Sequence, residues 1–226
     1  MLVRDWMSKE VITVNADDSM YHATQKLKEN NIRILPVMKS DKLVGVITDR
    51  DLKRSSASDA TTLEIHELLY ALSRIKVGEI MTKDPITVPP DFTVEETAEV
   101  ILKSRISGVP VLDEQSKVVG VITKTDLFKV LISLTGISKR GIQFAFLLDD
   151  RPGSIKEVAD IIRKHGARMV SILSTYDEVQ EGYRKVYIRI YDIQRPKLQE
   201  LKEELKKEFK VLYMVDLREN KREIYG

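Results

Sequence analysis

The chain has 226 residues, and its 37 Lys and Arg nearly balance its 35 Asp and Glu, giving a formal net charge of +2. This balance gives no electrostatic reason to expect a nucleic acid or an anionic membrane as a partner, because either would require a basic patch. The absence of cysteine excludes disulfides, thiolate metal sites and a cysteine nucleophile.

The N-terminal residues, MLVRDWMSKEV, lack the apolar core of a secretory signal peptide, and no apolar run is long enough to cross a bilayer. We therefore expect a cytoplasmic protein without a membrane partner. A chain of this length can hold one large domain or two to three small ones, each with its own core.

The first 137 residues contain two copies of one unit. MSKEVITV at 7–14 returns as MTKDPITV at 81–88, and LVGVIT at 43–48 returns as VVGVIT at 118–123. The offset between the copies grows from 74 positions (Thr13 to Thr87) to 75 (Thr48 to Thr123), so the second copy has gained one residue. This regularity indicates a duplication.

Each copy predicts the order strand, helix, strand, strand, helix. The expected strands are the β-branched runs VITV, LPVM and LVGVIT in the first copy, and PITV, VPVL and VVGVIT in the second. Ser19 and Thr93 are predicted helix N-caps, and Glu96 completes a capping box with Thr93. Gly136 is expected to end the last helix. Because so small a unit cannot cover both faces of its sheet, we expect the copies to pack as one pseudo-symmetric module.

Between the copies, Thr61 and Glu64 are spaced as a capping box. They precede a predicted helix with apolar residues at helical spacing: Ile65, Leu68, Leu69 and Leu72.

The repeated Thr-x-x-Asp sequence has two interpretations. Thr48 and Asp51, like Thr123 and Asp126, have the spacing of the N-cap and N3 residues of a helix. A helix N-terminus also attracts phosphate, since its first amide groups are unpaired and its dipole favours an anion. A carboxylate at the same place suits a ribose diol. The two interpretations are compatible, although the local pattern alone favours the cap.

The set M-[ST]-x-x-x-I-T-V, P-V and G-V-I-T-x-x-D-L occurs twice and resembles the CBS-domain family over about residues 1–137. The resemblance implies a Bateman module, a CBS pair whose clefts bind AMP, ADP, ATP, S-adenosylmethionine or NAD. It also implies that Thr48 and Asp51 hold phosphate and ribose in one cleft, and Thr123 and Asp126 in the other. The implied base-lining residues are Ile12, Ile34 and Leu35 in the first copy, and Ile86, Gly108 and Val109 in the second.

The two clefts are expected to differ in charge. Arg50 lies inside the first motif, with Lys53, Arg54 and Arg33 near it, whereas Lys124 is the cation inside the second. We therefore expect ligands with several phosphates to favour the first cleft.

Residues 142–226 predict a different unit in the order βαββαβ, the ferredoxin-like split βαβ arrangement. The expected strands are IQFAFLLD, RMVSILSTY, YRKVYIRIY and KVLYMVDL, and the expected helices are RPGSIKEVADIIRKHG and RPKLQELKEELKKEF. Ser154 and Glu157 have the spacing of a capping box at the start of the first helix.

The stretch D-x-P-G-x-I, from Asp150 to Ile155, together with this order resembles the ACT family of small regulatory domains. The resemblance implies an amino-acid ligand, with contacts from Asp149, Asp150, Gly153 and Ser154. Some ACT domains serve only as dimerisation surfaces, and both alternatives stay open here.

Catalytic chemistry finds no support in the sequence. His22, His66 and His165 each stand alone, and no Walker loop, nucleophile elbow or H-E-x-x-H motif is present. Trp6 and Met7, with Met81 as the equivalent of Met7, are expected to be packing residues. We therefore predict no enzyme activity, no catalytic residue, no metal site and no obligatory cofactor.

The prediction is an α+β protein with a pseudo-twofold CBS pair and a ferredoxin-like ACT domain. The expected boundaries are 1–60 for CBS repeat 1, 61–76 for the linker helix, 77–137 for CBS repeat 2, 138–141 for a linker and 142–226 for the ACT domain. This arrangement resembles acetoin-utilisation-type CBS–ACT proteins. It implies a homodimeric sensor that binds an adenine nucleotide, with or without Mg²⁺, and acts on a regulated protein. The alternative is an amino-acid-responsive sensor or interaction scaffold in which the CBS pair is structural.

Overall fold

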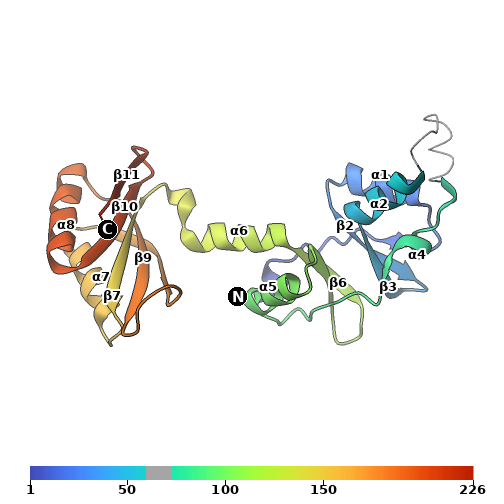
Figure 1. Ribbon diagram of the computed structural model, residues 1–226, viewed down its shortest axis with the longest axis horizontal. Coiled ribbons are helices and arrows are strands. Elements are labelled where there is room, and N and C mark those ends of the chain that lie inside the picture. The colour runs from blue at the N-terminus through green and yellow to red at the C-terminus, as the bar shows by residue number, and fades with distance from the viewer. Residues whose placement is uncertain (60–72, 226) are drawn as a thin grey trace. The chain divides into compact units, whose positions relative to one another are not determined.

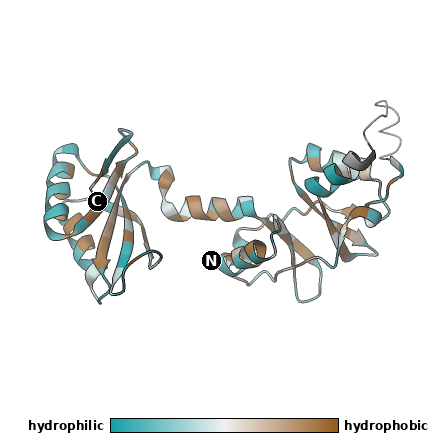
Figure 2. Ribbon diagram, in the orientation of Figure 1, coloured by the Kyte–Doolittle hydropathy of each residue, from teal (hydrophilic) through white to brown (hydrophobic). Residues whose placement is uncertain are grey.

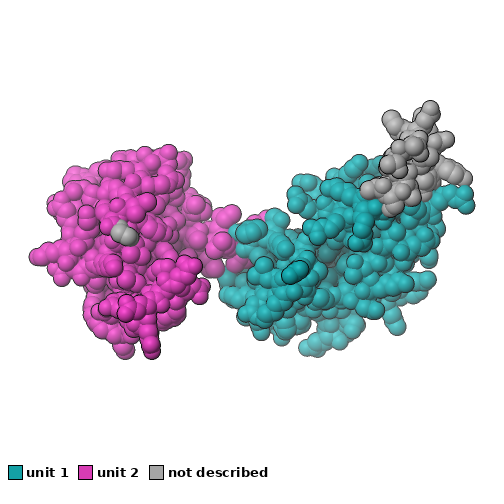
Figure 3. Space-filling model, viewed as in Figure 1, with its two compact units in different colours: residues 1–128 teal, residues 129–226 magenta. Residues whose placement is uncertain are grey.

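The computed structural model describes residues 1–59 and 73–225. The predicted helix after Thr61 lies outside the described residues. The chain divides into two compact units, Met1–Phe128 and Lys129–Gly226, coloured teal and magenta in Figure 3. Unit 1 has a four-stranded and a two-stranded sheet, unit 2 has one five-stranded sheet, and each unit has its own helices (Figure 1).

Unit 1 contains both repeats except the part of the last helix that follows Phe128 (Figure 1). Repeat 1 consists of η1 (Val3–Asp5), β1 (Val14–Asn15), α1 (Met20–Glu29), β2 (Ile34–Lys39), β3 (Lys42–Thr48) and α2 (Asp49–Asp59). Repeat 2 consists of α4 (Val77–Ile80), β4 (Thr82–Lys83), α5 (Val94–Lys103), β5 (Gly108–Leu112), β6 (Val118–Thr123) and α6 (Lys124–Thr135).

The predicted order of elements is present in repeat 1, but its first strand is shorter than expected. β1 pairs in parallel with β2 through only two residues. In repeat 2 the equivalent pairing is a single parallel bridge between Val88 and Val111. Both hairpins, β2–β3 and β5–β6, are antiparallel as predicted, so the hairpins are the main sheet structure of each repeat.

The two repeats exchange their N-terminal segments. β4 of repeat 2 pairs antiparallel with β3 of repeat 1, and Ser8 of repeat 1 forms a bridge with Val121 on β6 of repeat 2. In the same exchange, Val3 N of repeat 1 donates a hydrogen bond to Phe92 O of repeat 2 at 2.8 Å. The repeats therefore form one pseudo-symmetric module, as predicted.

Two glycines allow this exchange because each lies against a methionine of the other repeat. A Cβ atom on Gly45 would lie 2.5 Å from Met81 Sδ, and a Cβ atom on Gly120 would lie 2.2 Å from Met7 Sδ. Met81 packs against the repeat 1 core, formed by residues such as Met20, Leu35 and Ile47. The two methionines are thus packing residues, as predicted.

The helix caps of the two repeats differ as predicted. Ser19 Oγ accepts a hydrogen bond from His22 N at 3.2 Å at the start of α1. At the start of α5, Thr93 N and Oγ1 both donate to Glu96 Oε2 at 2.8 Å, which completes a capping box. The repeat 2 helix therefore has a carboxylate cap that the repeat 1 helix lacks.

Unit 2 has the predicted order βαββαβ and one additional strand. Its elements are η2 (Ile137–Lys139), β7 (Ile142–Asp149), α7 (Ser154–Lys164), β8 (Arg168–Thr175), β9 (Tyr183–Tyr191), α8 (Arg195–Glu208), β10 (Lys210–Asp216) and β11 (Lys221–Ile224). The sheet order is β11-β10-β7-β9-β8, with all neighbours antiparallel. Strand β11 was not predicted, since its sequence KREI is mostly charged.

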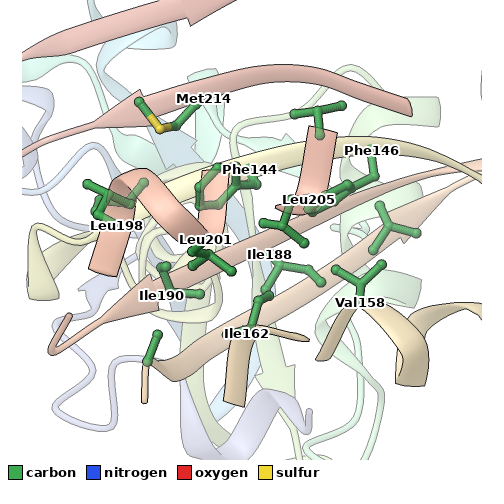
Figure 4. Close-up of a cluster of buried hydrophobic side chains, with 14 of the residues drawn as sticks. Phe144, Phe146, Val158, Ile162, Ile188, Ile190, Leu198, Leu201, Leu205 and Met214 are labelled. Carbon is green, nitrogen blue, oxygen red and sulfur yellow. The ribbon is translucent and has the colours of Figure 1, made fainter. Parts of the chain in front are cut away.

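The unit 2 core lies between the sheet and its two helices (Figure 4). Alternate residues of β7 point toward the helices, so Phe144 and Phe146 meet Leu201 and Leu205 of α8 there. The outer faces of α7 and α8 carry hydrophilic residues (Figure 2). This one-sided burial is typical of a sheet with helices on one face.

Helix α6 ends as predicted. Gly136 follows it in the left-handed region, with φ 61°, and a Cβ there would lie 2.7 Å from Val170 Cγ2. The carbonyl oxygen of Thr135, the last residue of α6, accepts hydrogen bonds from Ser171 Oγ at 3.0 Å and Arg189 Nε at 2.7 Å. The end of α6 is therefore fastened to strands β8 and β9.

Candidate functional site

Thr48 and Asp51 form a reciprocal cap at the first turn of α2. Thr48 N and Oγ1 donate to Asp51 Oδ2 at 3.0 and 2.7 Å, and Asp51 N donates to Thr48 Oγ1 at 3.3 Å. Arg54 Nη2 donates to the other carboxylate oxygen, Oδ1, at 3.3 Å. The capping interpretation of the sequence is therefore confirmed for this motif.

The second motif has the same geometry at the start of α6. Thr123 N and Oγ1 donate to Asp126 Oδ2 at 3.0 and 2.7 Å. The two aspartates are nearly buried, with exposed fractions of 9% for Asp51 and 6% for Asp126. A buried carboxylate is tolerated when it is hydrogen-bonded, so the pairs hold their side chains in fixed positions.

A cleft of about 700 Å³ opens beside the first motif. This volume lies within the usual range for a small-molecule site. Repeat 1 contributes β2 and β3 residues and the start of α2, and repeat 2 contributes the segments 82–86 and 105–108 with Lys124. The lining residues are Arg33, Ile34, Val46, Thr48, Asp49, Arg50, Asp51, Lys53, Thr82, Asp84, Pro85, Ile86, Arg105, Ile106, Ser107, Gly108 and Lys124.

Basic side chains outnumber acidic ones in this cleft. Lys53 Nζ lies 3.6 Å from Asp49 Oδ2, so this cation is already paired. The other four basic side chains have no hydrogen-bond or ion-pair partner among residues 1–59 and 73–225: Arg33, Arg50, Arg105 and Lys124. The cleft therefore favours an anionic ligand.

The structure revises the predicted division of residues between two clefts. Ile86, Gly108 and Lys124 were assigned to the second cleft, but they line the same cleft as Thr48 and Asp51. The physical reason is the exchange of segments, since β4 pairs with β3 and carries the chain that follows it toward the first motif. Lys124 therefore adds its charge to the Arg50 cleft, and the expected preference of multiphosphate ligands stays a prediction.

Two of the predicted base-lining residues belong to the core, and a third is partly buried against it. Leu35 and Val109 have no exposed surface, so they cannot contact a ligand in this conformation. Ile12 packs against the repeat 1 core, and Ile34 lines the cleft as predicted. On β2 and β5 the residue before the fully buried one, Ile34 or Gly108, lines the cleft, as the alternation of strand faces predicts.

Gly108 is explained by strand packing. A Cβ atom there would lie 2.9 Å from Ile122 O and 2.9 Å from Thr123 Cγ2. The glycine lets β5 approach β6 at the second motif. The sequence prediction missed Asp84, which is a variable position of the first family motif, and Arg105, which lies outside the motifs; both line the cleft.

In unit 2, three of the four predicted loop residues lie together. Asp150 Oδ1 accepts a hydrogen bond from Tyr176 Oη at 3.2 Å and lies 3.6 Å from Arg184 Nε. Arg184 Nη2 donates to the Oγ of Ser154, a buried residue, at 3.0 Å. Gly153 precedes α7 with φ 91°, and Asp149 is exposed at the end of β7.

The predicted capping box of α7 was wrong. Gly153 is the N-cap and makes no side-chain cap bond, so Ser154 is the first residue of the helix itself. Glu157 instead accepts two hydrogen bonds of 2.7 Å from Arg151, which hold the pKa of this carboxyl below its usual range. The Oγ of Ser154 instead accepts a hydrogen bond from Arg184, a residue that the sequence prediction did not include.

In the part of the chain that the structure describes, no group of three or more His, Asp or Glu side chains could hold a metal ion. His165 Nε2 lies 2.7 Å from Glu204 Oε2, and His66 lies outside the described residues. No described helix is both long and apolar enough to span a membrane.

Comparison with known proteins identifies the two repeats. The family model described as CBS domain matches residues 3–58 and 77–133. The CBS domain-containing protein DDB_G0289609 of Dictyostelium discoideum is 35% identical over 135 residues, which make up 59% of this chain and 93% of that protein. Inosine-5′-monophosphate dehydrogenase of Korarchaeum cryptofilum is 35% identical over 120 residues, which make up 53% of this chain but only 22% of that enzyme.

Solved structures agree with this assignment. The CBS domain pair of protein MJ0100, in complex with 5′-methylthioadenosine and S-adenosyl-L-methionine, is 33% identical and has a TM-score of 0.50. The match covers 58% of this chain and 99% of that one. A proposed acetoin utilization protein (AcuB) from Vibrio cholerae, 23% identical with a TM-score of 0.51, shares the fold over 62% of this chain and 96% of its own. None of these four matches covers more than 62% of the chain.

Proposed function

The chain belongs to the CBS-domain family, and from this premise we propose that it is a non-catalytic regulatory protein that binds an adenosine-containing ligand. The observation that carries the proposal is the cleft beside α2, where Thr48 and Asp51 are already fixed by mutual hydrogen bonds. The adenosine ligands of the MJ0100 domain pair support the choice of ligand class.

The cleft has a suitable group for each part of such a ligand. The first amide groups of α2 and the Thr48 hydroxyl would bind the phosphate nearest the ribose. Asp51 would accept hydrogen bonds from the ribose hydroxyls, as acidic residues do in dinucleotide folds. The apolar wall formed by Ile34, Ile86 and Ile106 would cover the base. A second site at Thr123 and Asp126 stays a prediction.

Regulation would follow from the position of the cleft between the repeats. Because its walls come from both repeats, a ligand bound there stabilises the relative arrangement that fits it best. The ligand shifts the equilibrium only by its difference in affinity between two arrangements. We propose that this shift is passed to a regulated protein, with the chain acting as a homodimer.

The test is thermal unfolding of protein stripped of co-purified ligand, with AMP, ADP, ATP, S-adenosylmethionine and NAD added singly, and with and without Mg²⁺ for ATP. A ligand at about 100 times its Kd adds about 2.7 kcal/mol to the free energy of unfolding. We expect a shift with at least one of these ligands, and its loss in Asp51→Ala.

Glu96→Ala is the matched control for Asp51→Ala. Glu96 caps α5 through the same three hydrogen bonds with Thr93, but it does not line the cleft. Both variants should be destabilised by the lost cap, and only Asp51→Ala should lose the ligand-induced shift. The absence of a shift with every adenosine ligand, or an equal loss in the two variants, would count against the proposal.

We further propose that unit 2 is an ACT domain. Its βαββαβ order, its sheet order and the D-x-P-G-x-I loop support this assignment. Arg184 donates a hydrogen bond to Ser154 of this loop. This position favours an amino-acid ligand, because the guanidinium would pair with the carboxylate of that ligand. Titration of single amino acids into the full chain and into Arg184→Gln tests this function. If no amino acid binds, the dimerisation surface remains as the role of unit 2.

A further inference from the structure

We propose that the exposed apolar face of α6 is a docking surface for an acidic amphipathic helix of a partner protein. This inference goes beyond the proposed function, because it names a surface and a partner chemistry that do not depend on a bound nucleotide. Three observations carry it: exposed apolar side chains on one face of α6, polar or small residues at the equivalent positions of α2, and cations along the same segment.

Helix α6 buries one face and exposes large apolar side chains on the other. Asp126 and Val130 are buried. Phe128, Leu131 and Ile132, which we call the α6 stripe, are 63%, 52% and 54% exposed. Their spacing of i, i+3 and i+4 places them side by side, so the helix alone fixes their relative positions. Hydrophobic residues cover most of α6 (Figure 2), and a helix that is hydrophobic all round is usually buried.

The fold of a repeat does not require the α6 stripe. Helix α2 begins after the same motif, and the offset between Thr48 and Thr123 also relates the positions of the stripe to those of α2. At these positions α2 has Lys53, Ser56 and Ala57. Because α2 is a helix without large apolar residues there, the stripe has a role other than forming the helix.

The exposed charged side chains along this segment are all cations. Residues 124–140 contain one acidic residue, Asp126, which is buried in the cap of α6. The exposed cations are Lys124, Lys129, Lys139 and Arg140. A partner therefore matches this surface best with apolar side chains flanked by carboxylates. A helix with leucines at i, i+3 and i+4 and glutamates on both flanks has this chemistry.

A second copy of the chain fits the α6 stripe less well. A twofold contact between two α6 helices brings cations against cations in either direction. If the helices run antiparallel, Lys124 of one copy faces the Lys139 end of the other, and if they run parallel, each lysine faces its equivalent. Like charges that oppose each other weaken such a contact. A homodimer formed through another surface is compatible with this inference.

A lipid bilayer is also a weaker fit than an acidic helix. An anionic bilayer attracts apolar side chains that lie beside cations, but the strength of binding scales with the apolar area that is buried. The three side chains of the α6 stripe offer little area for that purpose. A bilayer is therefore treated as an alternative that the experiment must separate from a protein partner.

The experiment uses a synthetic peptide of about 18 residues, long enough to form a helix, with leucines on one face and glutamates on both flanks. Fluorescence anisotropy measures its binding to the full chain without nucleotide. We expect binding that weakens at least tenfold in the double variant Leu131→Ser and Ile132→Ala, which installs the repeat 1 residues. Binding should also weaken as the salt concentration rises, because salt screens the flanking charges.

Two controls separate the α6 stripe from general stickiness and general charge. Ile224→Ser removes an 82% exposed apolar side chain on β11, outside the segment 124–140, and should bind the peptide as the unchanged protein does. A peptide with lysines in place of the glutamates should bind at least tenfold more weakly. All the variants change exposed side chains, so we expect each to keep its fold, which circular dichroism checks.

The outcomes that overturn the proposal are distinct. It fails if the glutamate peptide does not bind at concentrations up to about 1 mM, or binds the double variant and the unchanged protein equally well. It also fails if sedimentation shows a dimer that the double variant dissociates, because the stripe is then a contact between copies. Binding to phosphatidylserine vesicles that the double variant loses would assign the stripe to a membrane. None of these results changes the nucleotide-induced shift in thermal unfolding, so the proposed function is tested separately.

Discussion

Repeat 1 and repeat 2 have the same fold, and they differ mainly where a side chain faces the cleft or the surface. The residues that set the geometry recur: Thr48 and Thr123 cap their helices alike, and Gly45 and Gly120 each lie against a methionine of the other repeat. At other equivalent positions the chemistry changes, as in Asp49 and Lys124.

The outer faces of the helices that follow the motifs also differ. Lys53 on α2 corresponds to Phe128 on α6, and both side chains are exposed, with 63% of the phenylalanine accessible. Figure 2 shows that hydrophobic residues cover most of α6. The duplication thus kept one structural unit, while the two copies acquired different surfaces. The following predictions test how far the equivalence of the repeats extends.

The largest expected effect concerns the two glycines. Gly45→Ala should lower the free energy of unfolding by about 2–3 kcal/mol, because the new Cβ would lie 2.8 Å from the backbone oxygen of Thr82 as well as close to Met81. Gly120→Ala should cost about 1 kcal/mol, since the close contacts are atoms of the flexible Met7 side chain. Urea unfolding of both variants measures the difference.

A methionine substitution provides the control. Met7→Ala should relieve the effect of Gly120→Ala, and Met81→Ala should not fully relieve that of Gly45→Ala, because the carbonyl oxygen stays in place. Equal losses and equal rescue in the two repeats would show that the exchange is fully symmetric.

The next effect concerns the two motif aspartates. Asp51→Ala and Asp126→Ala should each lower the stability of the ligand-free protein by about 1–2 kcal/mol, because each removes a helix cap and the two hydrogen bonds that the carboxylate accepts from the motif threonine. Only Asp51→Ala should abolish nucleotide binding in the Arg105 cleft, whereas Asp126→Ala should leave that affinity within about threefold. Denaturant unfolding and calorimetry on the same preparations separate the two quantities. Equal losses of affinity would make the motifs equivalent ligand sites.

A smaller effect is expected from the caps of α1 and α5. His22→Glu would give repeat 1 the carboxylate that Glu96 provides in repeat 2, and it should stabilise the protein by about 0.5–1 kcal/mol at pH 7. The measurement is the midpoint of thermal unfolding. No gain would indicate that the Ser19 cap differs from the Thr93 cap in more than its missing carboxylate.

The same caps predict a dependence on pH. Hydrogen bonds from the backbone and hydroxyl of Thr93 lower the pKa of Glu96 below its ordinary value of 4.5. A carboxyl whose pKa is lowered in the folded state contributes stability above 4.5 and loses it as the pH falls through the folded pKa. Glu96→Gln should therefore weaken the acid dependence below pH 4.5, and His22→Glu should strengthen it. Thermal unfolding from pH 3 to 7 checks both signs.

The smallest effect on stability is expected for Phe128→Lys, which installs the repeat 1 residue. Because the side chain is 63% exposed, the free energy of unfolding should change by less than about 0.5 kcal/mol. Denaturant unfolding at low protein concentration measures this. A larger loss would mean that Phe128 is buried against another surface in solution.

Much of the fold could be predicted because its signals are local. The duplication, the hairpins and the βαββαβ order follow from strand periodicity and from residues that begin or end helices, such as Thr93 and Gly136. The exchange of segments could not be predicted in the same way, since the pairing of Gly45 with Lys83 joins residues from different repeats. The N-cap of α7 was predicted one residue too late, at Ser154. Gly153 occupies that position instead, with a backbone in the left-handed region.

The candidate site was predicted in part for the same reason. The capped Thr48 and Asp51 pair follows from a local motif, and the structure confirms its hydrogen bonds. Leu35 and Val109 were placed at the ligand because the motif includes them, but their strand faces point into the core. Arg105 reaches the cleft only through tertiary structure, so a motif search passes over it.

The exchange of segments between the repeats also bears on how the chain folds during synthesis. A nascent chain that ends before Met81 lacks both that methionine and β4, so β3 still has an unpaired edge and the contact at Gly45 is missing. Repeat 1 therefore cannot finish folding on the ribosome before part of repeat 2 has emerged. Since long-range pairings slow folding and unpaired strand edges promote aggregation, the half-made module is the stage at which this protein would depend most on a chaperone.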